Sequence, residues 1–292
     1  MRFTKTKAVL VAAGLSLSLA ACGGGGAEEG HIELEVADNP DLSGTPGQLA
    51  DDGKITIGVK IDQPGIGFEE PGADMPTGFD IEMARIIAAQ LGIEDTDIEF
   101  KETISDNREP FLKNGTVDLV LASYSITDER RAVVGQAGPY YVTGQQLLVR
   151  EDDKDKITGP DDLAGIKVCS VEGSTSLALV EDDYDAQPVP FGTYSECVDQ
   201  LTNDTVDAVT TDGAILLGYE ALDADNLEVV GDEFSEERYG IGFKLGDTEM
   251  CEFLSTTIEG AYEDGTWAEA FEATLGLSGV DTPEQPAVDA CV

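Results

Sequence analysis

The chain has 292 residues, of which 41% are apolar, and this length suits one or two globular domains. Acidic residues outnumber basic ones 59 to 17, which gives a formal net charge of −42. This balance excludes nucleic acid as a partner, because phosphate backbones are bound by basic patches. A single histidine, His31, lies in a polar stretch, so a Ser-His-Asp triad or a histidine-rich zinc site has little support. We expect no cofactor and no metal.

Residues 1–21 have the form of an export signal. Three basic residues precede an apolar run from Ala8 to Leu19, which is too short for a membrane-spanning helix of about 20 residues. The run ends in Leu19-Ala-Ala-Cys22, as in a bacterial lipobox, in which the cysteine is lipidated and becomes the new N-terminus. We predict a lipid anchor at Cys22 on the extracytoplasmic face of the cell membrane. The alternative is a soluble secreted protein cleaved near Ala21.

A flexible acidic tether is predicted to follow, from Cys22 to residue 53. The stretch contains glycines, acids and prolines but few large apolar side chains. Such a composition does not bury enough surface to fold. The tether would connect the membrane surface to the folded part of the chain.

Residues 54–142 have the pattern of an α/β lobe. Apolar residues first alternate, which indicates a strand, and then recur at helical spacing until Gly92 ends the helix. Strands that alternate with helices favour a mainly parallel sheet. The predicted elements are strands at 55–59, 98–100 and 117–121 and helices at 79–91 and 106–113.

The same pattern restarts in residues 143–242. Residues 203–211 repeat residues 114–122 with five identities in nine positions, at an offset of 89 residues. A chance match between two β-forming segments is the alternative, but the surrounding order of elements also matches, so we predict a second, repeated lobe. Its predicted elements are strands at 166–171 and from 206, a helix that opens at Gly173-Ser-Thr175, and a helix around 197–201.

The last segment, residues 243–292, is predicted to return to the first lobe. It carries two helices, at 250–261 and 267–275, and leaves no room for a third lobe. The chain would cross between lobes twice, near 141–148 and near 239–243, and two crossings make a hinge. The predicted fold is therefore α/β and two-lobed, with a mixed, mainly parallel sheet in each lobe.

Four cysteines remain besides Cys22, and disulfides persist in exported proteins. Cys169 and Cys197 fall in the same predicted lobe, while Cys251 and Cys291 both fall in the tail. We therefore predict the bonds Cys169–Cys197 and Cys251–Cys291. Free buried thiols are the alternative, and no C-x-x-C spacing supports a metal site.

Polar residues follow the two repeated strands. After the first comes Ala122-Ser-Tyr-Ser-Ile-Thr-Asp-Glu-Arg-Arg131, in which hydroxyls precede two arginines. The planar guanidinium group matches a carboxylate, although both arginines could instead be solvated loop residues. The second strand ends at Asp212. Ligands of open α/β sheets bind at the carboxyl ends of strands, so two facing lobes would bring a cation and an anion to one cleft.

These residues carry a resemblance to the family 3 solute-binding proteins of bacterial ABC importers for polar amino acids, and among them to the glutamate-binding lipoproteins of actinobacteria. The resemblance covers about residues 53–277 and implies a type II periplasmic-binding-protein fold. Its markers are Gly78-Phe-Asp-Ile81, Val117-Asp-Leu119, Ala122 to Arg130, Gly138-Pro-Tyr-Tyr141, Gly173-Ser-Thr175, Val206 to Asp212 and Tyr239-Gly-Ile-Gly242.

The resemblance implies roles for the residues that would hold the amino-acid end of a ligand. Arg130 stands where the family binds the α-carboxylate, with Ser125, Ser174 and Thr175 as further donors. The carbonyl of Ser123 and the carboxylate of Asp212 stand where the family binds the α-ammonium group. Residues 173–175 and Asp212 could instead only cap helices.

Selectivity for the ligand side chain is implied by a second group, formed by Lys60, Ser105, Arg108 and Tyr194. Ser105 and Arg108 resemble the residues that reach the distal carboxylate in glutamate and aspartate binders. Lys60 stands where those proteins carry a cation, which can also be an arginine, and Tyr194 where they carry a polar group. The alternatives are that Lys60 is a solvated loop charge and that Arg108 caps a local acid.

The function implied is that of a monomeric, lipid-anchored receptor that delivers glutamate to the permease subunits of an ABC importer. Glutamine or aspartate is the alternative ligand. Some relatives on this fold are cyclohexadienyl dehydratases, but the sequence offers no obvious general acid, so we expect no enzyme. A sensor or adhesin would call for a fused membrane span or signalling domain, and neither is apparent in the sequence.

Overall fold

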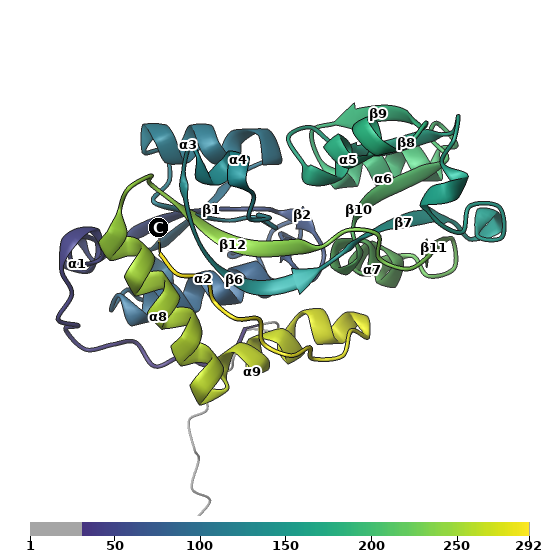
Figure 1. Ribbon diagram of the computed structural model, residues 1–292. Coiled ribbons are helices and arrows are strands. Elements are labelled where there is room, and N and C mark those ends of the chain that lie inside the picture. Colours follow the sequence, from purple (N-terminus) through teal and green to yellow (C-terminus); the bar gives the residue numbers. More distant parts are fainter. Residues whose placement is uncertain (1–30, 292) are drawn as a thin grey trace, which may run out of the picture.

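The computed structural model describes residues 31–291 (Figure 1). Two five-stranded sheets with helices around them form two lobes, so the predicted two-lobed α/β fold is confirmed. The predicted signal peptide and the lipidation site at Cys22 lie outside the described residues. Within residues 31–291, the helices are all too short or too polar to cross a membrane.

The sheet of lobe 1 has the strand order β4-β1-β5-β12-β6. β1 runs parallel to β4 and to β5, whereas β12 is antiparallel to β5 and β6. Helices α2, α8 and α9 lie on one side of this sheet and α3 and α4 on the other (Figure 1). The strands are β1 (Ile55–Val59), β4 (Ile98–Glu102), β5 (Leu119–Leu121), β6 (Gly135–Thr143) and β12 (Glu237–Phe243), and the helices are α2 (Phe79–Gln90), α3 (Arg108–Asn114), α4 (Asp128–Arg131), α8 (Thr248–Asp264) and α9 (Thr266–Ala273).

The sheet of lobe 2 has the order β11-β7-β10-β8-β9, in which β8 is parallel to β9 and β10, and β7 is antiparallel to β10 and β11. Its elements are β7 (Gln145–Arg150), β8 (Lys167–Val171), β9 (Gln187–Phe191), β10 (Ala208–Asp212), β11 (Leu227–Val230), α5 (Thr175–Asp183), α6 (Tyr194–Thr202) and α7 (Gly213–Leu222). A short hairpin, β2 (Asp62–Gln63) and β3 (Gly67–Phe68), projects from the end of β1.

The two repeated segments form the central strands of the two sheets. β5 lies between parallel β1 and antiparallel β12, and β10 lies between parallel β8 and antiparallel β7. Both strands are buried, which explains their apolar character. The repeat therefore marks equivalent positions in the two lobes.

The chain crosses between the lobes at Gly144, between β6 and β7, and again between β11 and β12. The first crossing lies where the sequence predicted it. The second lies earlier, because β12 starts at Glu237 and pairs with β6 over most of its length. The predicted return to lobe 1 at residue 243 is therefore wrong by six residues, since an apolar strand by itself does not reveal which sheet it joins.

Residues 31–53 pack against lobe 1, and for them the prediction of a flexible tether is wrong. Ile32 and Leu49 belong to the buried core, and α1 spans Gly44–Asp52. Arg85 on α2 donates through Nη1 to the Ile32 carbonyl over 3.1 Å. The prediction rested on the composition of this segment alone. A few apolar side chains are enough for such a segment to pack when the rest of lobe 1 provides a surface for them.

The two predicted disulfides both form. Cys169 on β8 joins Cys197 on α6, with Cα atoms 5.5 Å apart, and Cys251 on α8 joins Cys291, with Cα atoms 5.8 Å apart. In residues 31–291, the His, Cys, Asp and Glu side chains make no cluster of three or more that could hold a metal ion.

Candidate functional site

The predicted binding residues gather between the lobes, near the ends of β5 and β10. Nine of the ten line one small, nearly filled space of about 10 Å³: Ser105, Arg108, Ser123, Ser125, Arg130, Ser174, Thr175, Tyr194 and Asp212. The tenth, Lys60, is in contact with this group, because its Nζ atom donates to Ser105 Oγ over 2.9 Å. Ser176 and Thr211 also line the space and were missed by the sequence prediction.

Arg130 is buried at the end of α4, with 9% of its surface exposed. The hydroxyl of Thr127 caps this helix by accepting from the Arg130 amide. The guanidinium group donates through Nη1 to the Ser125 carbonyl over 2.6 Å and through Nη2 to the Gly173 carbonyl over 3.1 Å. Arg131 instead forms a half-buried ion pair with Asp289, 2.8 Å away. Only the first arginine therefore points into the cleft.

Arg108, the first residue of α3, is 2% exposed. Its guanidinium group donates to four carbonyl groups over 3.0–3.2 Å, those of Ser105, Ala122, Ser123 and Gly173. Burial, followed by the charge of Arg130, lowers the pKa of Arg108 to about 10, so the side chain remains a cation at neutral pH. None of these hydrogen-bond partners is an acid, which argues against the alternative that Arg108 caps a local carboxylate.

Gly173 is the point where lobe 2 meets the two arginines. Its carbonyl accepts from both guanidinium groups, which belong to lobe 1. Its φ of +76° lies in the left-handed region, and a Cβ at this position would lie 3.0 Å from the Asp106 Cα atom of lobe 1. Glycine therefore permits both the turn and the close approach of the two lobes.

Lys60 directly follows β1 and is 2% exposed, so the alternative of a solvated loop charge is wrong. Burial, followed by the charge of Arg108, lowers the pKa of Lys60 to about 7. An anion bound beside Ser105 would favour the protonated lysine, because a nearby opposite charge stabilises the charged form.

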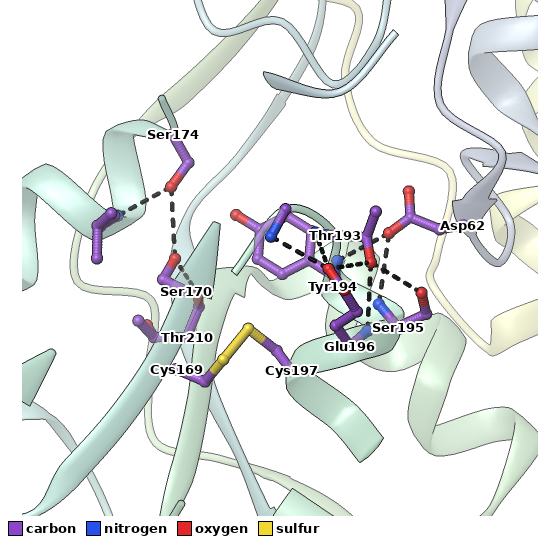
Figure 2. The surroundings of a disulfide bond; sticks show 12 residues. Asp62, Cys169, Ser170, Ser174, Thr193, Tyr194, Ser195, Glu196, Cys197 and Thr210 are labelled. Atoms are coloured by element: carbon purple, nitrogen blue, oxygen red, sulfur yellow. Dashed lines mark hydrogen bonds between the residues drawn. A yellow bond between two sulfur atoms is a disulfide. The ribbon is translucent and has the colours of Figure 1, made fainter. Parts of the chain in front are cut away.

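The lobe 2 residues that begin helices serve partly as caps. Ser174 Oγ accepts from the Leu177 amide over 3.0 Å at the start of α5, so this part of the capping alternative is correct. The next residue, Thr175, donates its hydroxyl to Glu237 Oε2 over 2.9 Å. Tyr194 begins α6, and its ring extends toward Ser170 and Ser174 while the Cys169–Cys197 disulfide holds α6 to β8 (Figure 2).

Asp212 ends β10 at the N-cap position of α7, but its side chain makes no capping bond. Oδ2 accepts from the Tyr239 hydroxyl over 2.6 Å, and Oδ1 is buried without a partner among the described residues. Burial, followed by the charge of Glu237, raises the pKa of Asp212 to about 7. A buried acceptor of this kind suits an ammonium group, which would supply the missing donor and favour the carboxylate form.

Two buried acids support the site and were not predicted. Asp80 on α2 accepts from the Ser123 amide over 2.7 Å and from the Tyr140 hydroxyl, and so holds Ser123 at a left-handed φ of +43°. In the sequence, Asp80 could have been noticed as an acidic residue within the apolar face of a helix. Glu237 lies at the hinge, where it accepts from Thr175 and Ser235. Nothing in the local sequence pointed to this role.

Further contacts hold the lobes together beside the site. Asp62, on the β2–β3 hairpin of lobe 1, accepts through Oδ2 from the Tyr194 amide over 2.8 Å and from the Ser195 amide over 3.4 Å (Figure 2). The N-terminus of a helix favours a negative charge, so this carboxylate links the hairpin to α6. The hydroxyl of Tyr219 on α7 also donates to the Asp62 carbonyl.

Comparison with known proteins fits this two-lobed site. Residues 55–276 match the family described as bacterial extracellular solute-binding proteins, family 3. The chain belongs to this family. The resemblance found in the sequence is thereby confirmed.

The names of several relatives of this solute-binding protein state which amino acid they bind. The glutamate-binding protein GluB of Corynebacterium glutamicum is 37% identical over 97% of this chain and 94% of its own. The glutamine-binding protein GlnH of Bacillus subtilis, named as part of an ABC transporter, is 33% identical over 87% of this chain and 90% of its own. Both names describe binding proteins rather than enzymes.

A solved structure of similar fold is that of the ancestral amino acid-binding protein AncCDT-1, a precursor of cyclohexadienyl dehydratase. It is 28% identical, covers 80% of this chain and 100% of its own, and superposes with a TM-score of 0.73. This neighbour is named as a binding protein, although it precedes an enzyme.

A wider groove of this solute-binding protein lies elsewhere on lobe 1, between residues 33–46 and helix α8. Acidic and apolar residues line it, among them Glu35, Asp38 and Phe253, and no Lys, Arg or His of the described chain does so. A groove of this composition would repel a carboxylate, so the interlobe space is the candidate site.

Proposed function

We propose that this solute-binding protein binds L-glutamate between its lobes and delivers it to the permease subunits of an ABC importer. One observation carries the proposal: two buried arginines of lobe 1 share a cleft with Asp212 of lobe 2, and a buried lysine lies behind them, hydrogen-bonded to Ser105. A molecule with two carboxylates and one ammonium group matches this set of charges. The names of the GluB relatives support the same ligand.

The amino-acid end of the ligand would lie between Arg130 and Asp212. The guanidinium group of Arg130 would bind the α-carboxylate in bidentate fashion, with the hydroxyls of Ser125, Ser174 and Thr175 nearby as further donors. Asp212, whose Oδ1 has no partner within residues 31–291, and the Ser123 carbonyl would accept from the α-ammonium group. To bind, the ligand would replace the contacts that both arginines now make with Gly173.

The distal carboxylate would lie against Lys60, Ser105 and Arg108, with Tyr194 closing the space from lobe 2. A charge-assisted hydrogen bond contributes about 1.5–3 kcal/mol, so a few of them reach the roughly −8 kcal/mol of a micromolar complex after ordering and desolvation. The large negative charge of the protein surface does not prevent this, because physiological salt screens charges beyond about 8 Å.

Glutamine is the second candidate ligand. The pKa of about 7 for Lys60 means that this side chain can also be neutral near pH 7, and a neutral amine suits an amide better than it suits a carboxylate. The GlnH relative is named for glutamine. Arg108 favours glutamate, because it remains charged and needs an anion in a closed cleft.

A thermal-shift screen against the common amino acids tests the proposal, since a ligand that binds only the native state raises the melting temperature. L-Glutamate should give the largest rise, and no rise with any amino acid would refute the proposed function. Turnover of prephenate or arogenate would instead support a dehydratase.

We also propose that Cys22 carries a lipid and holds a monomeric receptor on the extracytoplasmic side of the membrane. The family description as extracellular supports the location. The variant Cys22→Ser should appear in the soluble fraction of fractionated cells, and its retention in the membrane fraction would contradict the anchor.

A further inference from the structure

One aromatic ring lies against both arginines of the site. The ring centroid of Tyr124 is 4.6 Å from the guanidinium carbon of Arg108 and 5.0 Å from that of Arg130. Both distances fall within the range of about 6 Å in which a cation is attracted to the face of an aromatic ring. Tyr124 is fully buried and does not line the binding space, so it is not itself a ligand contact.

The hydroxyl end of the ring is fixed by Glu109. Oε1 of Glu109 accepts from the Tyr124 hydroxyl over 2.6 Å and lies 3.5 Å from Nε of Arg130. Burial, followed by the bond to Glu109, raises the pKa of Tyr124, which keeps the phenol protonated and able to donate. One carboxylate oxygen therefore connects the ring to one of the two cations.

The ring of Tyr124 also lies close to strand β12. A Cβ atom at Gly242 on β12 would lie 2.8 Å from Cε1 of Tyr124 and 2.8 Å from Cδ1 of Leu112. The ring thus packs directly on the backbone of β12, and a side chain at Gly242 would displace it.

The backbone around Tyr124 holds the same two arginines. The carbonyl of Ser123, the preceding residue, accepts from Arg108 over 3.2 Å, and the carbonyl of Ser125, the following residue, accepts from Arg130 over 2.6 Å. Three consecutive residues therefore fix both guanidinium groups, two through carbonyls and one through its ring.

We propose that Tyr124, fixed by Glu109 and Gly242, is a positioning residue that holds Arg108 and Arg130 side by side and so sets the preference for dicarboxylic over neutral amino acids. Two buried cations repel each other, and the negative face of the ring offsets part of this repulsion. Without the ring, one guanidinium group would turn away from the cleft, and the second carboxylate would lose its partner. This inference rests on the proposed function, in which the ligand is acidic.

Calorimetric titration of three variants with L-glutamate and L-glutamine tests the role of the ring. Tyr124→Leu removes the ring and should weaken L-glutamate binding about tenfold and L-glutamine binding about threefold at most, on the scale of two lost cation–π contacts. Tyr124→Phe keeps the ring and should retain the glutamate-to-glutamine affinity ratio of the wild type. Phe271→Leu, a buried ring of lobe 1 in an aromatic cluster with Phe79 and Tyr141, should lower the melting temperature without changing that ratio.

The outcomes separate this inference from the proposed function. A wild-type protein that does not bind L-glutamate overturns the proposed function and the inference with it. If the wild type binds L-glutamate and Tyr124→Leu keeps the same affinity ratio, only the role of Tyr124 is overturned. A loss of the ratio in Tyr124→Phe as large as in Tyr124→Leu would also overturn the role of the ring. If Tyr124→Leu does not melt cooperatively, Tyr124→Met replaces it, because an unbranched thioether adapts to irregular space.

Discussion

The two lobes contribute different chemistry to one site. Lobe 1 supplies the cations Lys60, Arg108 and Arg130, all buried and held mostly by backbone carbonyl groups. Lobe 2 supplies hydroxyl groups, one carboxylate at Asp212 and the Gly173 carbonyl. Two lobes built on a repeated pattern thus carry opposite charges at the ends of equivalent central strands. We infer that lobe 1 selects an anionic ligand, and that lobe 2 holds its ammonium group and closes the site.

Removing the central cation of lobe 1 should have the largest effect. Arg130→Ala should weaken amino-acid binding at least about 100-fold, because two charge-assisted hydrogen bonds to the α-carboxylate are lost. Calorimetry measures the affinity. The matched control is Arg131→Ala, which removes a neighbouring arginine that pairs with Asp289 outside the cleft and should leave the affinity within about twofold. An equal loss in the two variants would contradict the role of Arg130.

The second arginine should separate acidic from neutral ligands. Arg108→Ala should weaken L-glutamate about 30-fold but L-glutamine only a few-fold, since only the acidic ligand needs a distal cation. Competition binding with both amino acids measures the two losses. Because Arg108 also satisfies buried carbonyls, Arg108→Lys serves as a second variant that keeps the charge. Equal losses for the two ligands would remove its role in selectivity.

The acid of lobe 2 should link binding to pH. Asp212→Asn should weaken binding about tenfold, and wild-type affinity should fall as the pH drops below about 7, where the carboxylate becomes protonated.

The same raised pKa of Asp212 implies that the native state keeps a proton between about pH 4 and 7 that the unfolded state has lost, so the free energy of unfolding falls as the pH rises through that window. At pH 8 the variant should therefore melt at a higher temperature than the wild type. A wild-type affinity that is the same at pH 5.5 and pH 8 would contradict this assignment.

The contact between the lobes at Asp62 should have the smallest effect. Asp62→Asn removes the charge at the N-terminus of α6 and should weaken binding about two- to fivefold, through faster ligand dissociation in stopped-flow fluorescence. The control is Asp182→Asn, which changes an exposed acid on α5. If dissociation is unchanged in the first variant, Asp62 does not help to keep the lobes closed.

Much of this difference between the two lobes could be predicted from the sequence, because it depends on local sequence patterns. The repeat revealed two equivalent strands, and the polar residues at their ends marked both halves of the site. Arg130 and Asp212 could be located in this way, and the cysteines could be paired by lobe.

What escaped prediction depends on contacts between distant segments. Glu237 reaches Thr175 only because the hinge brings β12 to α5, and Asp80 reaches Ser123 only because α2 packs beside β5. Residues 31–53 looked unable to fold because their partner surface, which includes Arg85, lies elsewhere in the chain. Such pairings leave no periodicity and no short motif.

A crystal structure of the complex with L-glutamate tests the division between the lobes most directly. It should show the α-carboxylate on Arg130, the α-ammonium group on Asp212 and the distal carboxylate between Lys60 and Arg108. A distal carboxylate directed toward lobe 2, or an α-carboxylate that makes no contact with Arg130, would contradict the account.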